Sequence, residues 1–130
     1  MSYLLDTSTL LELLRASPPN GLVRRLSQVP TGERWTSVIT VSQLLLAARR
    51  EREMRLMQDM VRLVAAIRVA PYDLNAAQAF ARYRATVAES CETDDVMVAA
   101  IAAARDFTLV TRRSEDFERY DLRIENWATD

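Results

Sequence analysis

The stretch Tyr3-Leu4-Leu5-Asp6-Thr7-Ser8-Thr9-Leu10-Leu11, near the start of the chain, decides the fold class. Residues 3–5 form a short apolar run that is typical of a buried strand, and Asp6 ends this run. From Leu10 onward, leucines recur at helical spacing. The stretch therefore predicts a strand, a turn and a helix in direct succession.

The same alternation of strand and helix continues to the end of the chain. Further strands are expected at residues 35–38, 67–70, 107–111 and 122–127, and helices at 22–29, 40–66, 74–89 and 94–104, with a break near 49–53. Strands that alternate with helices predict a parallel sheet covered by helices on both faces. We therefore expect an α/β fold of three layers with a short parallel sheet of about four or five strands. A single domain is expected to span residues 1–130.

The composition excludes several classes of enzyme. The chain has no histidine, all 17 of its basic residues are arginine, and it has two glycines and one cysteine, Cys91. A Ser–His–Asp triad, a P-loop and a Gly-rich dinucleotide site are therefore excluded. Cys91 has no partner for a disulfide or a zinc site, so we interpret it as a packing residue. Acids, hydroxyls and arginines remain as the available chemistry.

Charge and hydrophobicity predict a cytoplasmic protein without a membrane span. The formal net charge is −1, so any contact with nucleic acid is expected to be local. The chain has no uncharged apolar run of about 18 residues, the length that a transmembrane helix needs. Asp6 interrupts the apolar N-terminus, and no basic region precedes it as in a signal peptide.

Three aspartates stand where a parallel sheet forms its binding sites. Asp6 follows the first strand, Asp116 lies shortly after the strand at 107–111, and Asp95 begins a helix. Ligands bind at the carboxyl ends of parallel strands, so the three carboxylates are expected to converge. Mg²⁺ and Mn²⁺ prefer oxygen ligands, and such a metal site hydrolyses phosphodiesters without histidine.

Each of the three acids also has a purely structural interpretation. Asp6 is a good N-cap for the helix that follows it, as Thr93 or Asp94 is for the helix that contains Asp95. Asp116 lies in a charged turn, for which a solvated surface is the ordinary interpretation. The sequence leaves these alternatives open beside a shared metal site.

Arginines cluster at two places that can hold RNA phosphates. The first group follows the expected helix start at residue 40 and consists of Arg49, Arg50, Arg52 and Arg55. The second lies just before Asp116 and consists of Arg112 and Arg113. Such contacts would be independent of RNA sequence. Because Glu51 and Glu53 are interleaved with the first group, a salt-bridged helix surface is an equal alternative there.

The chain resembles the PIN-domain family and, within it, the VapC-type toxins of bacterial toxin–antitoxin pairs. The matching stretches run in family order through nearly the whole chain, at residues 4–8, 37–44, 95–100, 109–112 with 116–117, and 122–127. The resemblance implies an endoribonuclease that depends on Mg²⁺ or Mn²⁺ and cleaves structured RNA such as tRNA or rRNA. It also implies a VapB-like antitoxin as partner and a homodimer. The acids of the family fall on Asp6, Asp95 and Asp116, which the resemblance implies as metal ligands. Asp94, which the usual family pattern lacks, and Thr111 are expected as auxiliary residues, and Arg112 and Arg113 as RNA contacts.

The chain departs from the family pattern most clearly at the second catalytic position. Gln43 stands where the family has a glutamate, so this position keeps its shape but loses its charge. Considered locally, Thr40 to Gln43 also matches a capping box, in which the glutamine reaches back to the cap residue. We predict that this copy is impaired, whether Gln43 is natural or was introduced. Ser8 is a further departure, at a position that is usually Asn. Arg113 is another, at a position that is usually Asn or Asp.

Two other functions stay open beside a VapC-like ribonuclease. The first is a catalytically inactive PIN-like module that binds an antitoxin or RNA. The second is an acidic phosphate-handling enzyme of another α/β class, although the absence of lysine argues against it. A test of RNA cleavage with Gln43→Glu separates the first from an active ribonuclease.

Overall fold

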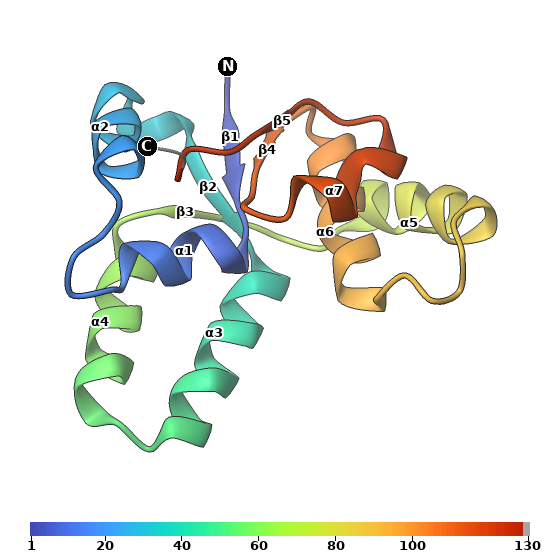
Figure 1. Ribbon diagram of the computed structural model, residues 1–130. Helices are drawn as coiled ribbons and strands as arrows, with labels where there is room; N and C mark the ends of the chain where they lie inside the picture. Colours follow the sequence, from blue (N-terminus) through green and yellow to red (C-terminus); the bar gives the residue numbers. More distant parts are fainter. Residues whose placement is uncertain (129–130) are drawn as a thin grey trace.

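A parallel sheet lies at the centre of the molecule. The computed structural model describes residues 1–128, so residues 129–130 of the expected domain lie outside the described part. Within it, the strands are β1 (Tyr3–Leu5), β2 (Arg34–Ser37), β3 (Arg68–Ala70), β4 (Thr108–Val110) and β5 (Ile124–Glu125). All neighbouring strands are parallel, in the order β3-β2-β1-β4-β5 (Figure 1). The predicted α/β fold with a parallel sheet is confirmed.

Helices connect these strands. They are α1 (Thr7–Leu13), α2 (Asn20–Gln28), α3 (Val38–Glu51), α4 (Met54–Ala65), α5 (Leu74–Thr86), α6 (Thr93–Ala104) and α7 (Ser114–Phe117), with 3-10 turns η1 (Thr31–Glu33) and η2 (Glu118–Tyr120). The predicted break near residues 49–53 is confirmed, because Arg52 adopts a left-handed conformation (φ 52°, ψ 31°) that ends α3. The helix predicted at 74–89 ends earlier, since Val87 is extended. Within residues 1–128, no helix combines the length and the apolar character that a membrane span requires.

The two faces of the sheet bury separate apolar clusters. Successive side chains of a strand point to opposite faces, so Leu4 and Leu5 of β1 belong to different clusters although both are fully buried. Leu4 packs with residues of α5 and α6, whereas Leu5 packs with residues of α1 to α4. Full burial of a leucine side chain stabilises a fold by about 1.5–3 kcal/mol. The strand of the opening stretch therefore holds the two helix layers together.

The order of the strands reverses between β1 and β4. From β1 the chain proceeds to β2 and β3 on one side, and it then crosses to β4 and β5 on the other. The backbone N–H of Asp6 donates to the carbonyl of Val110 at 3.0 Å, so the ends of β1 and β4 lie side by side. Ligands of parallel sheets bind at such a reversal, outside the carboxyl ends of the strands.

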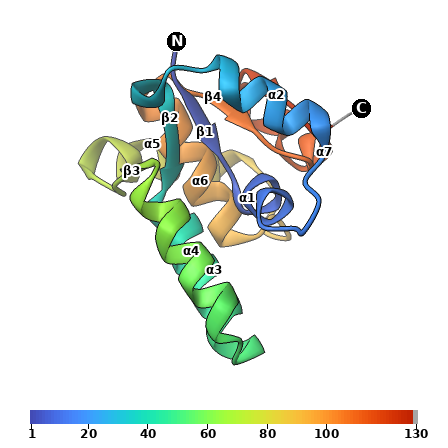
Figure 2. The same ribbon diagram turned by 90° about the vertical axis from the view of Figure 1, so that its left-hand side faces the viewer.

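Helices α3 and α4 form a hairpin that extends away from the sheet (Figures 1 and 2). The end of α3 and the start of α4 carry Arg49, Arg50, Arg52 and Arg55, all of them exposed. Among the ion pairs of residues 1–128, none joins these arginines to Glu51 or Glu53. The alternative of a salt-bridged helix surface is therefore wrong for this group.

Candidate functional site

Asp6 lies directly after β1, at the reversal of the strand order. Its Oδ1 accepts hydrogen bonds from the backbone N–H of Thr9 at 3.0 Å and from the hydroxyl of Ser8 at 2.8 Å. Its Oδ2 accepts from the hydroxyl of Thr111 at 2.5 Å. The predicted role of Asp6 as N-cap of α1 is confirmed, and its side chain is buried. Since a carboxylate offers about four acceptor positions, one remains for a further partner.

Thr111 links the ends of β1 and β4 in the same place. It follows β4 and is fully buried. Its hydroxyl donates to Asp6 and accepts from the backbone N–H of Arg113 at 2.9 Å. The loop after β4 is therefore fixed against the carboxylate that follows β1. Thr111 thus lies beside Asp6, as an auxiliary residue would.

Arg113 brings Asp95 and Asp116 together. The guanidinium Nη2 donates to Asp95 Oδ1 at 2.8 Å, and Nη1 donates to Asp95 Oδ2 and to Asp116 Oδ2, each at 3.1 Å. The pKa of Arg113 is raised, first by the hydrogen bond to Asp95 and further by the charges of Asp95, Asp6 and Asp116. The three acids therefore act on one cation, two of them by direct contact.

Asp94 and Asp95 lie in the first turn of α6. The N-cap position is Glu92, whose side chain makes no capping hydrogen bond, and the helix begins at Thr93. The prediction that Thr93 or Asp94 caps this helix is therefore wrong. Both aspartates are stabilised by the positive end of the helix dipole. Asp95 points to Arg113, whereas Asp94 accepts a hydrogen bond from Gln43.

Gln43 connects α3 to α1 and α6. Its amide oxygen accepts from the Thr7 hydroxyl, and its amide nitrogen donates to Asp94 Oδ2 at 3.0 Å. Helix α3 begins at Val38, where Ser37 accepts from the N–H of Thr40. The predicted capping box of Thr40 with Gln43 is therefore wrong, because Gln43 lies too far along the helix to reach its cap.

The side chain of Gln43 lines a hollow of about 480 Å³. Thr7 and Ser8, which follow β1, line the same hollow as Arg113. The polar residues of this hollow are Thr7, Ser8, Gln43, Arg50 and Arg113. A glutamate at position 43 would face Asp94 at hydrogen-bonding distance. The neutral amide is therefore compatible with Asp94 without a bound cation.

Glu12 also lies in this region, although it was not among the site residues predicted from the sequence. Glu12 lies in α1, is only 8% exposed, and accepts from Arg15 at 2.7 Å and from Arg112. Its pKa is lowered, first by the hydrogen bond to Arg15, although burial acts in the opposite direction. The only signal in the sequence was an acid within the leucines of residues 10–14. Both arginines predicted as RNA contacts, Arg112 and Arg113, are thus paired with acids.

The acids of this site are of the right chemical type to bind a divalent cation. Their spacing in this structure does not fit one. Asp95 and Asp116 share the guanidinium of Arg113, and Asp6 adds negative charge to the same place. Carboxylate oxygens of this kind are the ligands that Mg²⁺ and Mn²⁺ prefer. Within residues 1–128, however, no three Asp, Glu, His or Cys side chains lie close enough together to hold a metal ion.

Comparison with known families identifies the domain. The PIN domain family matches residues 3–122, which is most of the chain. The chain belongs to the PIN-domain family. The resemblance predicted from its sequence motifs is therefore confirmed. Among curated proteins, none matches the chain.

Several solved structures are similar to this PIN domain over nearly its whole length. DNA-bound VapBC from Salmonella typhimurium is 26% identical, with a TM-score of 0.83 and 98% of each chain covered. FitAcB from Neisseria gonorrhoeae is 25% identical, with a TM-score of 0.83, and the match covers 95% of this chain and 96% of that one. Mycobacterium tuberculosis VapC20, a toxin that cleaves the sarcin-ricin loop, shares the fold at 15% identity (TM-score 0.71, covering 91% and 95%).

Proposed function

We propose that this PIN domain is a VapC-type toxin, an endoribonuclease that depends on Mg²⁺ or Mn²⁺ and acts in the cytoplasm on structured RNA of the tRNA or rRNA class. The observation that carries the proposal is that Asp95 and Asp116 converge on the guanidinium of Arg113, beside Asp6, at the reversal of the strand order. Similarity to VapBC and FitAcB supports a VapB-like antitoxin as partner and a homodimer as the assembled form.

In this proposal Asp6, Asp95 and Asp116 hold the divalent ion. When bound, such an ion polarises the phosphodiester and makes water a stronger nucleophile. Thr111 and Ser8 orient the Asp6 carboxylate by donating hydrogen bonds to it. Asp94 adds negative charge at the edge of the site. Arg112 and Arg113 contribute to RNA binding once their guanidinium groups turn toward phosphate.

Gln43 lowers the activity of this copy. A glutamate at this position supplies a fourth negative charge and an oxygen basic enough to orient water, whereas an amide supplies neither. The amide is instead held between Thr7 and Asp94. Gln43→Glu places two carboxylates side by side, a pair that a divalent cation stabilises.

The test is cleavage of a panel of structured RNAs with Mn²⁺ by this chain and by Gln43→Glu. The expected result is little cleavage by the chain and robust cleavage by the variant, which is lost again when Asp95→Asn is added. Gln28→Glu is the matched control, because it makes the same change of charge at an exposed residue that ends α2. Equal and robust cleavage by the chain and by Gln43→Glu refutes the role given to this position.

A second candidate function is a module that binds an antitoxin or RNA without cleaving it. The hydrogen bonds of Gln43 favour it, because they satisfy the amide and one oxygen of Asp94 with neither a metal ion nor a substrate. If Gln43→Glu cleaves no RNA of the panel and binds no Mn²⁺, whereas an antitoxin binds the chain tightly, this second function replaces the first.

A further inference from the structure

Arg113 occupies the position on which the acids converge. Its guanidinium holds both oxygens of Asp95, at 2.8 and 3.1 Å, and one oxygen of Asp116 at 3.1 Å. A planar guanidinium that binds both oxygens of a carboxylate forms one of the strongest ion pairs found in proteins. One side chain of the protein itself therefore neutralises part of the charge that would attract a metal ion.

Two further contacts keep this side chain over the acids. The backbone N–H of Arg113 donates to Thr111, which itself donates to Asp6. The guanidinium carbon lies 5.4 Å from the ring centroid of Phe117, a buried residue of α7, and this distance is suitable for a cation–π contact. The side chain is 42% exposed, so it has solvent on one side into which it can turn.

A guanidinium and a small divalent ion cannot share this position. Mg²⁺ binds oxygen at about 2.0–2.1 Å, so the oxygens of its ligands lie only about 3 Å from one another. Arg113 instead keeps oxygens of Asp95 and Asp116 about 3 Å from its own nitrogens, and Nη1 donates to one oxygen of each. With Arg113 in this position, no three acids within residues 1–128 lie close enough together to hold a metal ion.

We infer that Arg113 is a built-in competitor of the metal ion: its guanidinium neutralises the acidic site, and a divalent cation binds by displacing it from Asp95 and Asp116. The inference rests on the proposed function, because it takes the acids to be the metal ligands. The raised pKa of Arg113 agrees with it, since it reflects attraction from Asp95 first and also from Asp6 and Asp116. Metal binding then requires these ion pairs to break and the positive charge of Arg113 to move away from the acids.

The experiment measures binding of Mn²⁺ to the whole chain without RNA, by calorimetry and by the electron paramagnetic resonance signal of free Mn²⁺. Arg113→Asn is expected to bind Mn²⁺ about tenfold more tightly than the parent chain, because no ion pair must break and no positive charge opposes the ion. Arg113→Lys keeps the charge but loses the two-pronged contact, so its affinity is expected to rise by about threefold or less.

Arg123→Asn is the matched control. Arg123 pairs with Asp106 at 3.0 Å and is 50% exposed, but these two residues lie in the segments that precede β5 and β4, and none of the contacts of Arg123 within residues 1–128 involves Asp6, Asp95 or Asp116. Its Mn²⁺ affinity is expected to equal that of the parent chain, which excludes an effect of net charge alone. Addition of Mn²⁺ is expected to raise the midpoint temperature of unfolding more for Arg113→Asn than for the parent chain or for Arg123→Asn. This measurement reports binding independently of the calorimetry.

Two results would contradict the inference, and they differ in what they imply for the proposed function. If Arg113→Asn binds Mn²⁺ no more tightly than the parent chain, and Asp95→Asn abolishes binding in both, the metal site stands and only the competition is refuted. If neither chain binds Mn²⁺ and Asp95→Asn changes nothing, the metal site itself fails, and the proposed function fails with it.

Discussion

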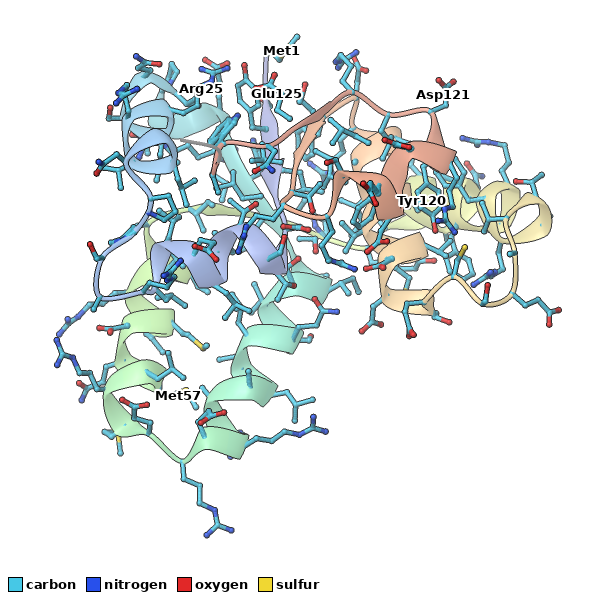
Figure 3. All side chains as sticks on the ribbon, viewed as in Figure 1. Met1, Arg25, Met57, Tyr120, Asp121 and Glu125 are labelled. Atoms are coloured by element: carbon cyan, nitrogen blue, oxygen red, sulfur yellow. The ribbon has the colours of Figure 1, made fainter. Side chains whose placement is uncertain are left out.

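Two partly exposed arginines of this molecule have different surroundings. Arg25 of α2 lies 5.2 Å from the ring centroid of Tyr3 and 5.1 Å from that of Trp127, and it donates to the Tyr3 hydroxyl at 3.0 Å. Within residues 1–128 the one acid that pairs with it is Glu125, at 3.4 Å; Figure 3 labels Arg25 and Glu125 near each other. Arg113 instead has two acids in direct contact.

The difference shows that the partners of an arginine decide what its removal does. Around Arg25 the partners are mainly aromatic rings, which remain uncharged when the arginine is lost. Around Arg113 they are carboxylates, which then repel one another and attract another cation. The first arginine joins α2 to β1 and to the C-terminal segment, whereas the second balances charge at the candidate site.

The largest effect on stability is expected for Arg25→Ala. The substitution removes two cation–π contacts and one hydrogen bond to a phenol, so the free energy of unfolding is expected to fall by about 1–2 kcal/mol. Urea denaturation followed by circular dichroism measures this change. Arg24→Ala, at the exposed neighbouring position, is the control and is expected to have little effect. A loss at Arg25 as small as that at Arg24 would show that the contacts of Arg25 with Tyr3 and Trp127 do not stabilise the fold.

Tyr3→Phe is expected to have the next largest effect. It keeps the ring beneath Arg25 but removes the hydroxyl that accepts the hydrogen bond, which costs about 0.5–1 kcal/mol in the same measurement. In the double variant with Arg25→Ala, the loss of unfolding free energy is expected to stay close to that of Arg25→Ala alone, because both substitutions remove the same hydrogen bond. Fully additive losses would contradict this coupling.

Arg113→Ala is expected to change stability by less than about 0.5 kcal/mol in the absence of metal ions at moderate salt, because exposed ion pairs contribute little. The effect is expected to be larger at low salt, where the freed carboxylates repel each other over a longer range. Urea denaturation at two ionic strengths measures it. A loss as large as that of Arg25→Ala would show that Arg113 is mainly a structural residue.

Glu12→Gln is expected to act mainly through the dependence of stability on pH. The folded-state pKa of Glu12 is lowered from 4.5, first by Arg15 and also by Arg112. Its contribution is therefore present above the unfolded pKa and is lost as the pH falls through the folded pKa. Glu12→Gln is expected to flatten this acid part of the profile, measured by unfolding between pH 7 and pH 3. Glu115→Gln, at an exposed position without an ion pair within residues 1–128, is expected to retain it.

Local patterns predicted the elements well and the ends of some elements less well. Strand β1 was predicted at residues 3–5 and was found there, because a short apolar run ended by a cap residue carries both boundaries. The start of α3 was misplaced, since both Ser37 and Thr40 are good caps and it is Ser37 that accepts the hydrogen bond from the backbone N–H of Thr40. The same ambiguity between neighbouring polar residues misplaced the cap of α6 at Thr93 or Asp94.

The partners of the site residues were harder to predict than their positions. Asp6, Asp95 and Asp116 were identified because they stand at the ends of elements, where a parallel sheet forms its sites. Nothing local indicated that Gln43 would bind Asp94, or that Glu12 would bind Arg112. These residues are 51 and 100 positions apart in the chain, so their contacts depend on how whole elements pack.

The sequence by itself determined the order of strands and helices, the parallel sheet and the acids at its carboxyl edge, because periodicity, caps and apolar runs are local properties. Only the tertiary structure decided that the guanidinium of Arg113 lies between Asp95 and Asp116 and that Gln43 spans Thr7 and Asp94. The physical reason is that a long polar side chain has many rotamers of similar energy. The charges and hydrogen-bonding groups that distant elements bring within about 3 Å select among them.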